Sequence, residues 1–283
     1  MVPMIDPTPV AGPPARCHTV SIAGVDPSGG AGVLADVKAM SALGAYACGV
    51  IAALTAQNTR GVTGIAPVAP EFVRQQILTL LDDVRIDAVK IGMLGQAPVI
   101  GAVAEALAPA NIPHIVLDPV MVAKSGDHLL ERQAVGALRE QLLPMATLIT
   151  PNLPEAGVLL DQRPVETLKE MRRVAERLRA VMAPANGRWV LLKGGHLPGS
   201  EAIDLLHDGD RMIELSAPKV PTRNTHGTGC TLSSALAALL PQHDDVPAAT
   251  RAAKDYVIQA LRHADRLKVG GGHGPLHHFY RWW

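Results

Sequence analysis

The chain has 283 residues, of which 48% are hydrophobic and 18% charged, and its formal net charge is zero. A neutral chain produces no long-range field that would attract nucleic acid or an anionic membrane. Aromatic residues make up only 3% of the chain, which is too few for a base-stacking surface. We therefore expect no nucleic-acid partner and no membrane partner. The high apolar content predicts a large, well-covered core.

The cysteines and the first residues indicate a cytoplasmic protein. Cys17, Cys48 and Cys230 form no C-x-x-C pair and leave one cysteine over after any single bridge, which favours a reducing compartment. Residues 1–16 contain five prolines and lack the basic start and apolar run of a signal peptide. We expect them to form a disordered leader. No stretch approaches the ~20 apolar residues that span a bilayer.

Short apolar runs alternate with helical patterns along residues 17–283. Strands are expected to begin at His18, Tyr46, Asp87, His114, Thr147 and Trp189, and a strand-rich patch covers 203–206 and 212–215. Helices are expected over 31–43, 71–81, 98–107, 131–142, 166–182, 228–240 and 246–267. Apolar strands separated by amphipathic helices are typical of parallel βαβ units covered on both faces. The sequence predicts a single three-layer α/β/α domain over 17–283 with a central, mostly parallel sheet.

Such sheets bind ligands at the carboxyl ends of their strands. Segments rich in Gly, Pro and polar residues follow the predicted strands, at 24–30, 57–58, 92–93, 118–120, 152–155 and 193–196. We therefore expect one functional site at this edge of the sheet.

The strongest local signal is NTHGTGC, from Asn224 to Cys230, followed by the helical run TLSSALAALL. Glycines permit close backbone approach, and a helix start presents unpaired N–H groups at the positive end of the macrodipole. We expect Gly227, Thr228 and Gly229 to hold an anion and to stabilise charge on a phosphoryl group in transfer. The alternative is a glycine turn before an ordinary core helix.

Cys230 would lie in the first turn of that helix, where the pKa of a thiol can be lowered toward neutrality. We expect it to accept or orient a proton from a substrate hydroxyl. The common alternative for a cysteine is a small buried hydrophobe, which is the interpretation for Cys17 and Cys48.

Two common nucleotide-binding motifs are missing from the sequence. Gly24 to Gly29 has the spacing of a G-x-x-x-x-G-K-[ST] loop, but Gly30 stands where the lysine is required. The early glycines also fail to give G-x-G-x-x-G. We therefore exclude the P-loop class and expect no nicotinamide cofactor.

The segments AGVDPSGGAG, SALGAYACGVIAALTAQNTRGV, DVRIDAVKIGML, LITPNLPEA, LLKGGH, NTHGTGCTLSSALAALL and GGGHGPLHHFYRWW resemble bacterial hydroxymethylpyrimidine and phosphomethylpyrimidine kinases, in order from about His18 to Trp283. The resemblance implies a ribokinase-like fold, a homodimer, and ATP with Mg²⁺ as the phosphoryl donor. It also implies two successive transfers in one pocket. The first is to the hydroxymethyl oxygen of 4-amino-5-hydroxymethyl-2-methylpyrimidine, and the second is to the resulting monophosphate, giving a diphosphate for thiamine assembly.

The resemblance assigns the pyrimidine to a set of residues after the first strands. Gln57 would hydrogen-bond the ring nitrogen and the amino group, which suits the paired donor and acceptor of a carboxamide. Asp36 would face the substrate end, while Gly24, Met93 and Val120 would line the faces of the ring. The alternatives are a loop-stabilising amide for Gln57, a solvated helix charge for Asp36 and core packing for Met93.

Asn152 and Glu155 resemble the N-x-x-E element of the superfamily, which places magnesium and phosphate partly through water. The alternative is a helix cap with an acidic first turn. Lys193 would neutralise phosphate charge, and Asp118 would hold the water shell of the cation, so no direct metal ligand is expected. The wider superfamily commonly has an aspartate where Cys230 stands, and cysteine there is typical of the pyrimidine-kinase branch and of some vitamin B6 kinases.

Several residues near the site are interpreted as structural. We expect His226 to cap or pack, although it could touch phosphate, and we expect no metal at His273, His277 and His278. The aromatic tail 279–283 should pack on the body or across a dimer contact. The polar segment 124–127 is a candidate lid.

Three other functions stay open. The first is a pyridoxal or pyridoxine kinase of the same superfamily, whose substrate also carries a hydroxymethyl group on a nitrogen ring. The second is a non-catalytic vitamin-binding protein, which would have no need for the Gly227–Cys230 turn beside Asn152 and Glu155. The third is a transferase with Cys230 as nucleophile, for which the sequence names no base.

Overall fold

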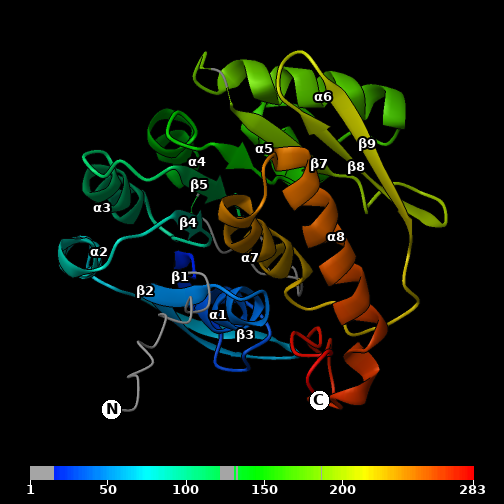
Figure 1. The fold of residues 1–283 in the computed structure, drawn as a ribbon, viewed down its shortest axis with the longest axis horizontal. Coiled ribbons are helices and arrows are strands. Elements are labelled where there is room, and N and C mark those ends of the chain that lie inside the picture. Colours follow the sequence, from blue (N-terminus) through cyan, green and yellow to red (C-terminus); the bar gives the residue numbers. More distant parts are fainter. Residues whose placement is uncertain (1–15, 122–130, 132, 186) are drawn as a thin grey trace, which may run out of the picture.

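The computed structural model describes residues 16–121, 131, 133–185 and 187–283 (Figure 1). These residues build a nine-stranded sheet in the order β3-β2-β1-β4-β5-β6-β7-β8-β9. The strands are β1 His18–Val25, β2 Tyr46–Asn58, β3 Gly61–Pro67, β4 Ala88–Ile91, β5 His114–Leu117, β6 Leu148–Ile149, β7 Trp189–Lys193, β8 Glu201–His207 and β9 Met212–Pro218. Neighbouring strands are parallel from β2 to β7, and β3, β8 and β9 pair antiparallel. The predicted mostly parallel sheet is confirmed.

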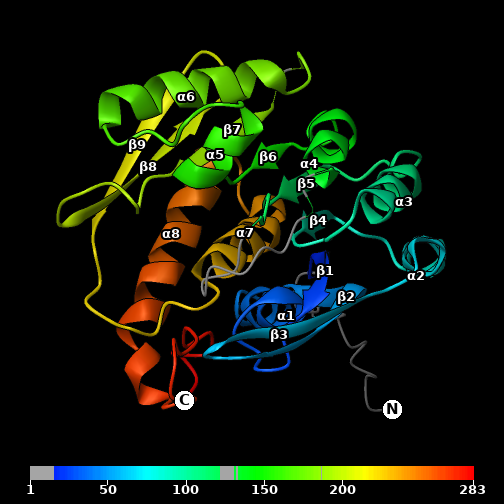
Figure 2. The same cartoon turned by 180° about the vertical axis from the view of Figure 1, so that it is seen from behind.

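Helices cover both faces of this sheet (Figure 1 and Figure 2). One core contains the inner side chains of α2 Pro70–Asp83, α3 Ala97–Leu107, α4 Ala134–Ala137, α5 Leu153–Leu159 and α6 Leu168–Val181. The other contains those of α1 Gly32–Ala42, α7 Thr228–Leu239 and α8 Val246–Arg262. In β4, Val89 and Ile91 join the first core and Ala88 the second. The three-layer α/β/α architecture follows from strands that are apolar on both faces.

The structure differs from the sequence prediction at several boundaries. β2 continues through Asn58 and turns into β3, a strand that the sequence analysis did not predict. β3 has two glycines and is exposed along most of its length, so it carries no apolar alternation that would indicate a strand. The helix expected over 131–142 begins at Ala134 and ends in a π-helical turn, Leu138–Leu142. The expected leader and the expected lid at 124–127 lie outside the described residues, apart from Arg16.

No helix among the described residues is both long enough and apolar enough to cross a membrane.

Candidate active site

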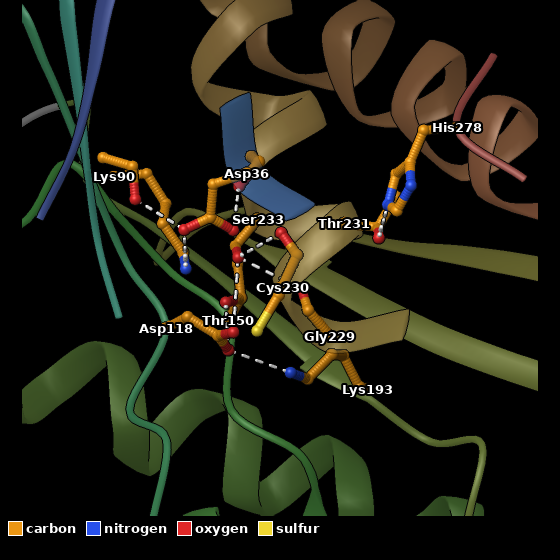
Figure 3. A network of polar contacts seen from close by, with 12 residues as sticks. Asp36, Lys90, Asp118, Thr150, Lys193, Gly229, Cys230, Thr231, Ser233 and His278 are labelled. Atoms are coloured by element: carbon orange, nitrogen blue, oxygen red, sulfur yellow. Dashed lines mark hydrogen bonds and ion pairs between the residues drawn. The ribbon is translucent and has the colours of Figure 1, made fainter. Parts of the chain in front are cut away.

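Asp118, directly after β5, lies at the centre of a polar cluster at the carboxyl edge of the sheet (Figure 3). Its Oδ1 accepts hydrogen bonds from Lys193 Nζ and Thr150 Oγ1, each at 3.0 Å. Its Oδ2 accepts one from Ser233 Oγ on α7 at 3.2 Å. Burial acts to raise the pKa of Asp118, but the ammonium groups of Lys193 and Lys90 and these hydrogen bonds outweigh it and hold the pKa below its usual range. Asp118 is therefore a buried carboxylate that connects β5, β7 and α7.

Glu155, in the first turn of α5, is the second acid of this cluster. Its Oε2 lies 4.0 Å from Lys193 Nζ. Burial raises the pKa of Glu155 to about 7, and the charge of Asp118 adds to this effect while Lys193 opposes it. Glu155 N–H donates to Asn152 Oδ1 at 2.9 Å, and Asn152 N–H donates to Glu155 Oε2 at 2.8 Å. The helix-cap interpretation is thus confirmed as a capping box, and the same carboxylate also faces Lys193.

The oxygen atoms of Asp118, Glu155 and Asn152 are the kind of ligand that Mg²⁺ prefers. In the part of the chain that the structure describes, no group of three or more His, Cys, Asp or Glu side chains could hold a metal ion. Magnesium commonly binds through one or two carboxylates, retained waters and phosphate oxygens. The two acids therefore fit a hydrated cation that is held partly by phosphate.

The start of α7 lies beside this cluster. Gly227, at the N-cap, has a left-handed backbone with φ 78°, and a side chain there would overlap the carbonyl of Gly30. Only glycine suits such a position. A Cβ placed on Gly229 would lie 3.3 Å from Lys193 Nζ and 3.7 Å from Asp118 Oδ2. The predicted anion turn, the lysine and the acid thus come from separate segments and meet at one place.

Cys230 lies in the first turn of α7, as expected, but its acidity is not as expected. Burial, with the charges of Asp36 and Asp118 adding to it, raises the pKa of the thiol to about 11, although Lys90 and a backbone hydrogen bond from Gly32 act in the opposite direction. The prediction of a lowered pKa is therefore wrong, because a helix N-terminus does not offset the desolvation of this thiol. Figure 3 shows the Cys230 sulfur directed to the same side as Asp118 and Lys193.

Asp36 does not meet the expectation that it faces the substrate. It lies on the inner side of α1, is 0% exposed, and forms an ion pair with Lys90 of β4 at 2.7 Å. Ser21 Oγ donates to its Oδ2 at 2.5 Å, and Ser234 Oγ donates to its Oδ1 at 2.7 Å. The alternative of a solvated helix charge is wrong as well. Asp36 is a buried anion that joins β1, β4 and α7 beneath the anion turn.

The residues expected to line the faces of the pyrimidine lie near the ends of β1, β4 and β5. Gly24 N–H donates to Met93 O at 3.0 Å, and a Cβ on Gly24 would lie 2.7 Å from Met93 Cε. Val120 N–H donates to Asp118 O, and its side chain is half-buried. A side chain at position 24 would require the terminal methyl group of Met93 to shift.

Gln57 lies within β2 and not in a loop after it, so the expected position needs correction. Its side chain is half-buried, and Thr55 Oγ1 donates to its Oε1 at 3.0 Å. Thr55 Oγ1 also lies 2.9 Å from Val25 O at the end of β1. Thr55 therefore orients the carboxamide of Gln57 relative to the end of β1.

The pair of Asp26 and His226 was not predicted from the sequence. Asp26 Oδ2 lies 2.7 Å from His226 Nε2, and Asp26 also accepts hydrogen bonds from Ser28 N, Ser28 Oγ and Ala31 N. Burial acts to raise the pKa of Asp26, but the hydrogen bonds from His226 and Ser28 hold it below its usual range. The run D-P-S-G-G, in which an aspartate can bond its own turn, was the available signal. His226 packs as predicted, and it fastens the turn after β1 to the turn before α7.

Lys90 was also missed, although a single lysine in the buried strand AVKI was a usable signal.

The C-terminal histidines and the tail are structural in part, as expected. Thr231 Oγ1 lies 3.0 Å from His278 Nε2, and both residues are buried. Tyr280 stacks on His263 with ring centroids 5.2 Å apart. Trp282 and Trp283 differ from the expectation of packing on the body, because they are 69% and 65% exposed.

Comparison with known proteins identifies the family. Residues 26–277 match the family model described as phosphomethylpyrimidine kinase. The chain belongs to this family. It is 51% identical over 268 residues to the hydroxymethylpyrimidine/phosphomethylpyrimidine kinase of Escherichia coli, a match that covers 95% of this chain and 99% of the relative. The chain is therefore a kinase, a phosphotransferase.

Two further proteins that resemble this chain bear on its function. The thiamine biosynthesis bifunctional protein of Geobacter sulfurreducens is 45% identical over 263 residues, which are 93% of this chain and 52% of that protein. The pyridoxal kinase of Staphylococcus aureus, solved in complex with ADP, has a TM-score of 0.85 and 30% identity, with 95% of each chain covered.

Proposed function

We propose that the chain transfers the γ-phosphoryl group of ATP to the hydroxymethyl oxygen of 4-amino-5-hydroxymethyl-2-methylpyrimidine, and then phosphorylates the monophosphate, in thiamine biosynthesis. The observation that carries the proposal is the meeting of the Gly227–Gly229 turn with Lys193 and Asp118. The family membership and the relatives named for the same kinase activities support this choice of substrate.

The anion turn and Lys193 supply most of the chemistry in this proposal. Phosphoryl transfer passes through a loose transition state that needs positioning and fixed positive charge more than covalent help. Residues Gly227 to Gly229 form the N-terminal end of α7, which is the positive end of its dipole, and the Lys193 ammonium adds a full charge beside them. Together they stabilise the charge that develops on the γ-phosphoryl oxygens.

In this proposal Cys230 does not act as a thiolate base. With a pKa of about 11, its side chain is a neutral thiol at neutral pH. We propose that it orients the substrate hydroxyl by hydrogen bonding, and that the alcohol proton passes to an oxygen of the transferring phosphoryl group as the alcohol oxygen bonds to phosphorus. A loose transition state loses little from a late proton transfer.

Asp118, Glu155 and Asn152 would hold Mg²⁺ through water, and the cation would offset phosphate charge when bound. Glu155, whose pKa is raised to about 7, has to lose its proton to take this role. Lys193 pairs with Asp118 at 3.0 Å and lies 4.0 Å from Glu155, so it limits the repulsion between the two acids.

Gln57 would hold the pyrimidine. The hydrogen bond from Thr55 Oγ1 fixes the carboxamide so that its N–H₂ group can donate to a ring nitrogen. Gly24, Met93 and Val120 would contact the ring faces, and Gly24 and Met93 are in direct contact with each other.

Incubation with MgATP and the pyrimidine alcohol, followed by mass spectrometry for one or two added phosphates, tests this function. The structural likeness to pyridoxal kinase makes pyridoxal the competing substrate. The decisive quantity is the ratio of the two kcat/KM values. A ratio that favours pyridoxal would show that pyridoxal is the substrate in place of the pyrimidine. ATP hydrolysis at a rate that depends on neither compound would indicate a binding protein.

We also propose that the protein is a cytoplasmic homodimer. The apolar side chains Leu54 and Ile65 on the β2–β3 hairpin are 53% and 44% exposed, which supports a contact there. Sedimentation equilibrium tests the oligomeric state.

A further inference from the structure

The glycine-rich residues 270–275, here called the C-terminal strap, run between the tip of the β2–β3 hairpin and the turn before α7. In both views of the fold the red C-terminal segment meets the end of the β2–β3 hairpin (Figure 1 and Figure 2). At the hairpin, Gly272 N–H donates to Thr59 Oγ1 at 3.2 Å, and His273 N–H donates to Thr59 O at 2.8 Å. Two neighbouring amides of the strap thus hold one residue of the hairpin tip.

The next residue of the strap, Gly274, contacts the turn before α7. Gly274 N–H donates to Asn224 Oδ1 at 3.1 Å, and Gly274 O accepts a hydrogen bond from His226 N–H at 3.0 Å. Asn224 and His226 lead directly into Gly227 and the anion turn. Three consecutive residues of the strap therefore contact both regions.

The glycines allow this close approach. A side chain on Gly272 would overlap the carbonyl of Thr59, and one on Gly274 would overlap the side chain of Asn224. Gly272 and Gly274 are two residues apart, so the chain between them spans at most about 7 Å. The strap sets an upper limit on the separation of the hairpin tip and the anion turn.

The end of β2 that carries Gln57 needs such support. β2 pairs with β1 only up to Leu54, and its last residues pair with β3. β3 is itself an exposed edge strand, and hairpins without further packing are marginally stable. Gln57 lies two residues before Thr59, at the point where the strap holds the hairpin.

We propose that the C-terminal strap is a positioning element that keeps Gln57 at a fixed distance from the anion turn, with Thr59 as the positioning residue on the hairpin. This inference rests on the proposed function, in which Gln57 holds the acceptor and the anion turn holds the donor phosphate. In-line phosphoryl transfer depends on the placement of the two reactants. Movement of the hairpin tip would therefore reduce turnover of the pyrimidine without weakening the binding of ATP.

Thr59→Val tests the inference, because it keeps the shape of the side chain and removes the acceptor of the Gly272 amide. We expect kcat/KM for the pyrimidine alcohol to fall about fivefold, the factor that corresponds to one net hydrogen bond, while KM for ATP stays within about twofold. Thr59→Ser keeps the hydroxyl and should restore wild-type values. Thr63→Val is the matched control, because Thr63 Oγ1 donates to Ala56 O within the hairpin and does not involve the strap.

Wild-type kinetics in Thr59→Val, an equal loss in Thr59→Ser, or an equal loss in Thr63→Val would each overturn the proposal. Amide hydrogen exchange adds a readout that does not depend on the substrate: residues 55–62 should exchange faster in Thr59→Val, and β4 should not change. Unchanged exchange in 55–62 would show that the strap does not restrain the hairpin. If the wild-type chain fails to phosphorylate the pyrimidine, the proposed function fails, and the exchange experiment still decides whether the strap holds the hairpin.

Discussion

Replacing Lys90 with methionine removes the only cation that the Asp36 carboxylate contacts at ion-pair distance among the described residues. Both side chains are 0% exposed, and Nζ lies 2.7 Å from Oδ2. Removing one partner of a buried pair costs about 3–5 kcal/mol, because it leaves an uncompensated charge. Asp36 would retain the hydroxyl hydrogen bonds from Ser21 and Ser234, which places the expected loss of unfolding free energy near the lower end, at about 3 kcal/mol.

The double variant Lys90→Met/Asp36→Asn tests whether charge is the cause. Asparagine keeps the shape and can still accept from a serine hydroxyl, so the double variant should recover most of the loss. Urea unfolding at pH 7, followed by circular dichroism, gives the unfolding free energies of the wild type, of Lys90→Met, of Asp36→Asn and of the double variant. From these four values we expect a coupling energy of at least about 2 kcal/mol between the two positions. Arg172→Met is the control, because its partner Glu214 is 38% exposed and such pairs contribute about 1 kcal/mol or less. A Lys90→Met loss below about 1 kcal/mol, or strictly additive losses, would refute the reasoning.

Other groups give further tests. Lys193→Met should lower kcat at least about 100-fold through loss of charge stabilisation, with an unchanged far-ultraviolet spectrum; near-normal turnover would remove Lys193 from the mechanism. The rate of Cys230 alkylation, measured by mass spectrometry from pH 7 to 9, should rise about tenfold per pH unit without a plateau, because its pKa is about 11. A plateau near pH 7 would contradict the raised pKa. Burial lowers the pKa of His278 to about 3, and the charge of Lys38 adds to this effect. The unfolded state takes up a proton at this side chain near pH 6.5, whereas the folded state does not. The urea concentration at the unfolding midpoint should therefore fall as the pH drops from 6.5 toward 3. His278→Gln should flatten that decline, and an unchanged slope would show that His278 is not its source.

The parallel sheet and the glycine turn before α7 could be predicted from the sequence because each depends on a local pattern. Apolar runs of β-branched residues separated by helical periodicity require strands that are covered on both faces. The glycines before α7 indicate close backbone approach, and the structure shows such contact between Gly227 and Gly30. The prediction that Lys193 and Asp118 meet at the same edge is confirmed by their 3.0 Å contact.

The errors concern properties that depend on distant segments. The pKa of Cys230 is set by burial and by Asp36, Asp118 and Lys90, which come from three other elements. The inward direction of Asp36 depends on Lys90, 54 residues further along the chain. β3 was missed because an exposed edge strand carries no apolar pattern. The contacts of the strap with the hairpin join residues more than 200 positions apart, as between Gly272 and Thr59, and no local signal specifies them.

A crystal structure of the chain with a non-hydrolysable ATP analogue and the pyrimidine alcohol tests the two-substrate site most directly. The account predicts that the terminal phosphate binds the amides of Gly227 to Gly229, and that the ring binds Gln57 with its hydroxymethyl oxygen directed at that phosphate. Two ligands bound in separate cavities, with the alcohol too far from the phosphate for transfer, would contradict it.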